Sequence, residues 1–186
     1  MRNIVLAGVV GVLLGCGNTE TSAEDAKKGP VVKLGSLSSQ APGDWKEEPP
    51  ANRMRLMQFV LPKAEGDKKD AELVIFRGIG GSTQANIERW KKQFIPPTGK
   101  KLDDVAKVSE MKVGDAKVTY LDISGTYLFK PRPFVPDSQA VRMPEYRMLA
   151  VVFLTKDDVY HIRLVGPEKT VKKHKDNFDK WLKSFR

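Results

Sequence analysis

An uninterrupted run of apolar residues, Met148 to Leu154, limits the architectures that this chain can adopt. A strand in which polar and apolar side chains do not alternate is buried on both faces, so its sheet needs cover on both sides. The strand-like segment 146–155 is followed by the polar turn 156–158 and by a second strand-like segment, 159–166. Because so short a connection joins antiparallel neighbours, we expect an antiparallel sheet covered on both faces.

Two more pairs of strand-like segments precede this one. Segments 53–62 and 71–78 lie on either side of the polar stretch 63–70. Segments 105–113 and 116–129 lie on either side of Gly114-Asp115, a tight-turn signal. Each pair is predicted to form a hairpin.

Two segments show helical spacing instead. Ile87, Trp90 and Phe94 recur at helical intervals in 83–95, after the strand-breaking Gly80-Gly81 and the capping residues Ser82 and Thr83. The segment 168–185 carries an apolar stripe of Val171, Phe178, Trp181, Leu182 and Phe185. We therefore predict one domain, residues 31–186, with an α+β fold in which helices sandwich an antiparallel sheet.

The order of these elements and the stretches GGSTQANIERWKKQF, LDISGTY, YHIRLVGPEKTV and FDKWLKSF resemble the PsbP-like fold group. This α/β/α group is named for an extrinsic subunit of photosystem II and includes a nuclear-import factor that binds the GTPase Ran. The resemblance covers residues 45–186 and is greatest to uncharacterised secreted bacterial lipoproteins. Known members are mostly accessory or binding subunits without a shared catalytic motif. The resemblance therefore implies a binding module, and neither photosystem nor Ran binding is carried over.

The first fifteen residues have the pattern of a secretory signal peptide. Arg2 is followed by the apolar run 4–15, which is shorter than the roughly 20 residues of a membrane-spanning helix. Leu13-Leu14-Gly15 then precede Cys16, the only cysteine of the chain, in a pattern that resembles a bacterial lipobox. We expect lipid to be attached to Cys16. The alternative is an ordinary signal peptide with an incidental cysteine.

Residues 16–30 are small and polar and are predicted to tether the domain to the membrane. Gly17, in place of an aspartate that would favour retention in the inner membrane, favours an outer-membrane anchor. The expected location is thus the bacterial cell envelope. With a single cysteine, an intramolecular disulfide and a cysteine metal cluster are excluded.

The chain is basic, with a formal net charge of +9. Anionic lipid headgroups or acidic envelope polymers suit such a surface. Alternatively, the lysines only keep the domain soluble. Because the chain has no arginine-rich run and no stacking-aromatic motif, we expect no nucleic-acid partner.

Few residues have the chemistry of a catalytic site. Of the two histidines, His174 lies between Val171 and Phe178 and is interpreted as a packed residue. His161 shares a strand face with Arg163, and with Asp122 these residues are a candidate polar cluster, either a structural network or an acid–base pair. No spacing indicates a catalytic serine, a metal site or a cofactor, so none is expected.

The segment 130–146, KPRPFVPDSQAVRMPEY, is predicted to be a long loop stiffened by prolines. Its candidate partner contacts are Arg132, Phe134, Val135 and Arg142, because arginine among apolar residues is enriched in protein interfaces. Loops of this length are often functional. The alternative is a connection that folds back over the edge of the sheet.

Two functions remain open from the sequence. The first is a lipid-anchored, non-enzymatic binding or assembly protein of the envelope, whose partner is an envelope protein or an acidic polymer. The alternative is a hydrolase acting on an envelope polymer, which would use the cluster of Asp122, His161 and Arg163.

Overall fold

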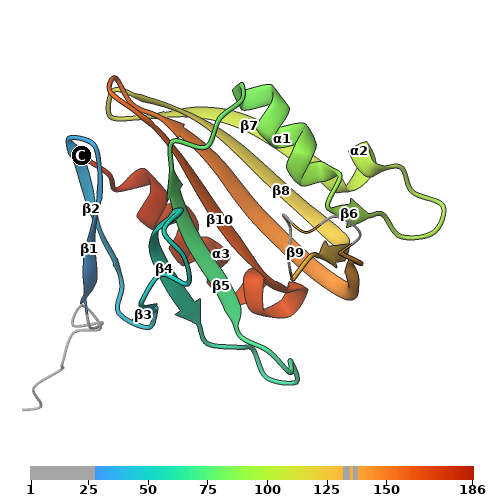
Figure 1. The fold of residues 1–186 in the computed structure, drawn as a ribbon. Coiled ribbons are helices and arrows are strands. Elements are labelled where there is room, and N and C mark those ends of the chain that lie inside the picture. Colours follow the sequence, from blue (N-terminus) through green and yellow to red (C-terminus); the bar gives the residue numbers. More distant parts are fainter. Residues whose placement is uncertain (1–27, 132–134, 136–137) are drawn as a thin grey trace, which may run out of the picture.

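The computed structural model describes residues 28–131, 135 and 138–186 (Figure 1). The predicted signal peptide, the lipid site at Cys16 and most of the predicted tether lie outside these residues. The last residues of that tether, Lys28 to Pro30, belong to the first strand.

In the described part of the chain, five strands come first, and the three helices follow among the remaining strands. In chain order, the elements are β1 (Lys28–Leu34), β2 (Leu37–Pro42), β3 (Lys46–Glu48), β4 (Arg55–Leu61), β5 (Ala71–Arg77), α1 (Thr83–Lys91), β6 (Phe94–Ile95), α2 (Leu102–Val105), β7 (Ala106–Val113), β8 (Ala116–Phe129), β9 (Val141–Leu154), β10 (Val159–Pro167) and α3 (Glu168–Lys183).

The main sheet has eight strands in the order β3-β4-β5-β10-β9-β8-β6, with β7 also paired to β8. All of its pairs are antiparallel. The predicted hairpins β4–β5, β7–β8 and β9–β10 are confirmed. A separate two-stranded sheet, β1–β2, packs against α3.

The two faces of the sheet carry separate cores, one under each long helix (Figure 1). On the α3 face, Val171, Phe178 and Trp181 pack against side chains such as Leu149 and Leu164. On the α1 face, Ile87 and Trp90 pack against side chains such as Val152. The protein therefore has an α+β fold with a large antiparallel sheet and helices on both of its faces, as expected from the two-sided burial of β9.

The first helix is shorter than predicted. It begins as expected, with Ser82 Oγ accepting from the amide of Ala85 at 3.2 Å, but it ends at Lys91. Phe94 and Ile95 instead pair with Tyr127 and Thr126 as β6. Phe94, the last residue of the predicted apolar stripe, thus belongs to a strand, because its backbone pairs with β8.

The β1–β2 hairpin is absent from the sequence prediction. Its signal is a short alternation along β1: Val32 and Leu34 are buried, and Val31 and Lys33 are exposed. The hairpin turns at Gly35, whose φ is 64° and whose amide donates to the hydroxyl of Tyr160 at 2.8 Å. A single such alternation beside a polar segment is too short to be distinguished from a tether.

Strand β9 begins earlier than predicted. The segment 141–145, assigned from the sequence to a loop, continues β9 and pairs with the end of β8. The prediction of one loop over 130–146 is therefore wrong in its second part. Pro144 is tolerated because the register shifts between Gly125 and Tyr127, which places the proline at a β-bulge.

Candidate functional site

Beyond a β-bulge, residues 127–129 of β8 pair with residues 141–143 of β9, and β6 lies beside them (Figure 1). We call this end of the hairpin the extension. Its bulge depends on Gly125, whose φ is 151° and where a Cβ atom would lie 2.6 Å from the carbonyl oxygen of Ile95. Across the bulge, Glu145 has a φ of 56°, which is unusual for a residue other than glycine. The bulge thus lies directly before the last residues of β8 and the first residues of β9 that pair with them.

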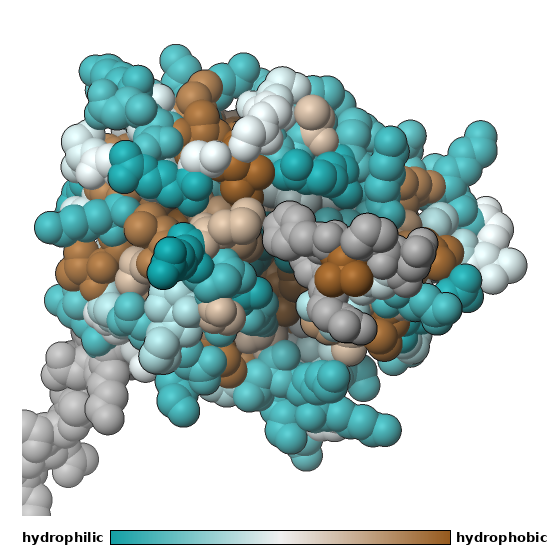
Figure 2. Space-filling view, in the orientation of Figure 1, coloured by the Kyte–Doolittle hydropathy of each residue, from teal (hydrophilic) through white to brown (hydrophobic). Residues whose placement is uncertain are grey.

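Large apolar side chains are exposed at the end of this extension. Phe129 is 42% exposed and pairs with Val141, which is 51% exposed. Val135, in the connection between the strands, is 46% exposed. Figure 2 shows apolar surface at this end of the sheet among hydrophilic residues. We call Phe129, Val135 and Val141 the apolar tip.

Basic residues accompany the apolar tip. Lys130 is exposed, and Arg142 is exposed opposite Leu128. Of the four candidate contacts from the sequence, Val135 and Arg142 thus lie on the surface, as the interaction hypothesis requires. The other two, Arg132 and Phe134, lie outside the described residues.

Aromatic rings pack next to the apolar tip. The ring centroids of Phe94 and Tyr127 are 5.3 Å apart, and those of Tyr127 and Phe129 are 6.4 Å apart. Tyr146 stacks on Tyr127 with centroids 6.1 Å apart and an interplanar angle of 14°. Burial raises the pKa of the Tyr146 hydroxyl. One side of the exposed Phe129 therefore contacts the buried ring of Tyr127.

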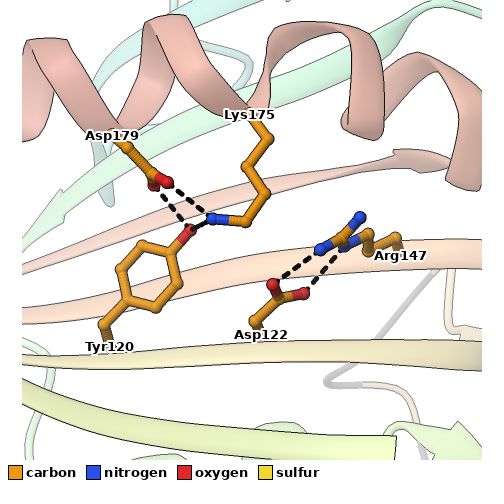
Figure 3. A network of polar contacts seen from close by, with 5 residues as sticks. All are labelled: Tyr120, Asp122, Arg147, Lys175 and Asp179. Carbon is orange, nitrogen blue, oxygen red and sulfur yellow. Dashed lines mark hydrogen bonds and ion pairs between the residues drawn. The ribbon is translucent and has the colours of Figure 1, made fainter.

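A polar network lies between β8, β9 and α3 (Figure 3). Arg147 donates two hydrogen bonds to Asp122, at 2.8 and 2.6 Å, and the bond to this carboxylate raises the pKa of the guanidinium. The Tyr120 hydroxyl lies 2.9 Å from Asp179, and Lys175 Nζ lies 2.6 Å from the same carboxylate. Burial, followed by the charge of Asp179, raises the pKa of Tyr120. Two carboxylates thus face two cations, and the network balances its own charge.

The predicted cluster of Asp122, His161 and Arg163 is not assembled. Asp122 pairs with Leu149 on the α3 face, whereas His161 pairs with Val152 on the α1 face. Directly opposed residues of neighbouring strands share a face, so the sheet itself separates Asp122 from the other two. The prediction failed because the face of Asp122 depends on how β8 pairs with β9, and the face of His161 depends on how β10 pairs with β9. Neither pairing can be read from one strand alone.

His161 is buried in an apolar environment, and it shares its face with Arg163 as predicted. Its ring lies edge-on to Trp90, with centroids 5.8 Å apart. Among the described residues, neither ring nitrogen has a hydrogen-bond partner. Burial, with a smaller effect from the charge of Arg89, lowers the pKa of His161 to about 4. Arg163 lies over the ring of Phe76 at 5.9 Å rather than beside an acid.

His174 is packed, as its position in the sequence predicts. It is 1% exposed, and its Nε2 lies 2.8 Å from the carbonyl oxygen of Pro62. Its Nδ1 lies 3.5 Å from Asp44. This histidine joins α3 to the β4–β5 connection.

Two of the surface clefts that the described residues form were compared with the candidate residues. The larger, of about 790 Å³, lies between the β1–β2 hairpin and α3 and is lined by residues such as Gln40, Asp44, Asn177 and Lys180. The other, of about 630 Å³, contains Arg55 and Arg77, which pair with Glu72 and Asp158. Neither histidine lines these clefts. Within the described part of the chain, no group of histidine, cysteine or acidic residues could hold a metal ion, and no helix is long and apolar enough to cross a membrane.

The chain was compared with known proteins. It matches no protein-family model and no curated protein. Among solved structures it is similar to PA94, a protein of unknown function from Pseudomonas aeruginosa. The identity is 14%, the match covers 83% of this chain and 94% of PA94, and the TM-score is 0.43. A likeness this distant carries no argument about family or function.

Proposed function

We propose that this protein is a lipid-anchored binding or assembly protein of the bacterial cell envelope. We place it in the PsbP-like fold group, with the apolar tip and Arg142 contacting a protein partner. The observation that carries the proposal is the apolar tip itself, with Phe129, Val135 and Val141 all more than two-fifths exposed on a supported extension.

The composition of the apolar tip is typical of a surface that contacts another protein. Apolar and aromatic side chains with arginine are the mixture enriched in protein interfaces. Exposed apolar residues that occur singly need no explanation. Phe129 and Val141, however, pair directly across the two strands, and Val135 lies in the connection between them. By proximity in the sequence, Arg132 and Phe134 belong to the same proposed contact.

The anchor rests on the sequence around Cys16. Strand β1 begins at Lys28, twelve residues after that cysteine. A chain of this length spans at most about 40 Å, so the lipid would keep the domain close to the membrane surface. Replacing Cys16 with serine should abolish metabolic labelling with a lipid precursor and release the protein from the membrane fraction. Labelling that persists in this variant would contradict the anchor.

The hydrolase alternative has no supporting observation among the described residues. Asp122 is paired with Arg147, and His161 lies on the opposite face without a polar neighbour. A general acid or base must reach the substrate. His161 is fully buried and lines neither of the two clefts, so it cannot. We therefore propose binding alone.

The tip is tested by crosslinking in native membranes. A photo-crosslinking residue at the exposed position Gln139 should capture a reproducible protein partner. The double variant Phe129→Asp/Val141→Asp should abolish this capture, because two carboxylates replace apolar contacts. The matched control is Met54→Asp/Leu56→Asp, since these residues are 53% and 42% exposed but lie at the start of β4.

The control decides the outcome. Capture that survives in the control and disappears in the tip variant supports the proposal, provided that both variants keep the thermal stability of the parent. Equal capture by the parent and the tip variant would refute a contact through the tip. Loss in both double variants would show that any added charge prevents capture, and it would also count against a specific tip.

A further inference from the structure

The solvent-facing side of α3 carries a stripe of lysines. Its exposed residues recur at intervals of three and four, and this spacing puts them on one side of a helix. The exposed residues of α3 are Glu168, Lys169, Lys172, Lys173, Asp176, Asn177, Lys180 and Lys183. We call the five lysines of this set the lysine stripe. Two carboxylates, Glu168 and Asp176, lie among them.

The fold makes little use of these lysines. Lys173 donates to the carbonyl oxygens of Pro62 and Lys63 at 3.3 and 3.2 Å. The other four lysines form no ion pair or hydrogen bond with any described side chain. Lys175, outside the stripe, instead pairs with Asp179. Lys180 and Lys183 lie in the last turn, where cations complement the helix dipole, whereas Lys169 and Lys172 lie in the first half of α3 and gain nothing from it.

The chain leaves the described domain beside this stripe. Ser39 of β2 lies 2.6 Å from Ser184, and its hydroxyl donates to the carbonyl oxygen of Trp181 at 3.2 Å. These contacts hold the β1–β2 hairpin along the C-terminal half of α3. Lys28, where β1 begins, lines the same cleft as Lys180. The twelve residues that lead back to Cys16 therefore start next to the lysine stripe.

An exposed apolar residue lies at the same place. Val31 is 54% exposed and pairs with Gln40, which lines that cleft. The surface beside the point of exit thus combines cations with an apolar side chain. This combination suits the boundary between lipid headgroups and acyl chains.

We propose that the lysine stripe lies against the anionic phospholipid surface of the membrane in which the protein is anchored. The inference rests on the proposed lipid attachment at Cys16, which brings α3 within reach of the headgroups. Lysines near an anionic surface are attracted to it over about one Debye length. Because α1 and α3 lie on opposite faces of the sheet, this orientation directs the α1 face away from the membrane (Figure 1).

The orientation can be measured with introduced cysteines. The full chain, produced in a bacterial host, is placed in vesicles of phosphatidylcholine alone or mixed with phosphatidylglycerol. One probe is Asn177→Cys, at the exposed edge of the stripe, and the control probe is Ala85→Cys, exposed on α1. The readout is the rate of labelling by a charged maleimide that does not cross membranes, after subtraction of the rate for the parent chain.

We expect labelling of Asn177→Cys to be at least about tenfold slower on the anionic vesicles than on the neutral ones. Labelling of Ala85→Cys should not change. High salt should restore the rate at position 177, because salt screens the attraction. Equal rates at position 177 on both kinds of vesicle would overturn the inference.

Charge reversal sharpens the test. Lys172→Glu/Lys180→Glu/Lys183→Glu should remove the protection at position 177. The matched variant Lys92→Glu/Lys107→Glu/Lys112→Glu changes the net charge equally at exposed positions on other elements and should retain the protection. Loss in both variants would show that net charge alone acts, and it would overturn the assignment to the stripe.

Two further outcomes separate this inference from the anchor. A parent chain that high salt washes from the neutral vesicles has no lipid anchor, and the proposed function then fails first. A chain that stays on those vesicles, and whose position 177 is protected by a soluble polyanion such as heparin but not by anionic lipid, refutes the membrane contact and assigns the stripe to an acidic polymer.

Discussion

Each face of the sheet buries one histidine, but the two histidines differ in the hydrogen-bond partners of their ring nitrogens. On the α3 face, His174 is 1% exposed and contacts the carbonyl oxygen of Pro62. On the α1 face, His161 is fully buried, and the described residues offer its nitrogens no partner. The same side chain at equal burial is thus part of a polar contact on one face and an unsatisfied group on the other. The difference shows that burial by itself does not define the role of a titratable residue.

The faces also differ in the size of their cores. The α3 face gathers Trp45, Phe59, Phe178, Trp181 and Phe185 into one cluster, whereas the α1 face has fewer buried residues under a helix of nine residues. We expect stability to depend more on the α3 face. The following predictions test this comparison.

The largest effect is expected from Phe178→Ala. Phe178 is fully buried and contacts the rings of Trp45, Tyr120 and Trp181, so its truncation should cost about 3–5 kcal/mol of unfolding free energy. The matched change Phe94→Ala, in the core of the α1 face, should cost less. Urea unfolding of both variants measures this difference. An equal or larger loss for Phe94→Ala would reverse the comparison.

Acid should weaken the protein through His161. Its pKa falls from 6.5 to about 4 on folding, so the unfolded chain binds this proton at a higher pH than the folded one. Stability is then complete above pH 6.5 and falls as the pH decreases toward 4, by about 3 kcal/mol in total. Unfolding free energies across this range should show the loss in the parent, and the loss should be smaller in His161→Leu. An identical acid response in the two proteins would disprove the assignment.

The two histidines should respond to leucine with opposite signs at neutral pH. His161→Leu removes unsatisfied nitrogens and should stabilise the protein by about 1–2 kcal/mol. His174→Leu removes the contact to Pro62 and should destabilise it by about 1 kcal/mol. Thermal or urea unfolding at pH 7.5 gives both values. Destabilisation by His161→Leu would indicate a partner for this histidine and restore a functional interpretation.

The smallest differences are expected among the ion pairs and charged side chains. Asp122→Asn leaves the largely buried Arg147 without its carboxylate and should cost about 1–2 kcal/mol. Arg163→Ala, on the α1 face, removes a contact with one ring and should cost about 0.5–1 kcal/mol. Comparable losses would show that the network in Figure 3 contributes no more than a contact with one aromatic ring.

Much of the fold follows from local patterns. The hairpins β4–β5, β7–β8 and β9–β10 and the helix α3 were predicted close to their observed bounds. Each depends on neighbouring residues, because turns and side-chain periods act over a few positions. The errors occur where distant segments decide. Phe94 and Ile95 form a strand because β8 is next to them, and residues 141–145 extend β9 because the bulge accommodates Pro144.

The candidate site divides in the same way. Val135 and Arg142 were predicted from composition and lie on the surface. Phe129 and Val141 were not predicted as contacts. In the sequence, Phe129 only ends a strand-like segment and Val141 lies within the predicted loop. The sequence analysis predicted the apolar side of α3 but did not single out the lysine stripe, whose place beside the exit of the chain no local pattern shows. That place depends on the packing of β2 on α3 through Ser39.

The sequence by itself determined three antiparallel hairpins, the helix α3 and the two-sided cover of β9, and the lipid site at Cys16 stays a prediction. Only the tertiary structure decided which polar residues meet. Asp122 and His161 lie on strands that are not neighbours, and a change of one residue in either register would move a side chain to the other face. Register across β9 is set by the packing of the whole sheet, and for this reason the predicted cluster was divided between two faces.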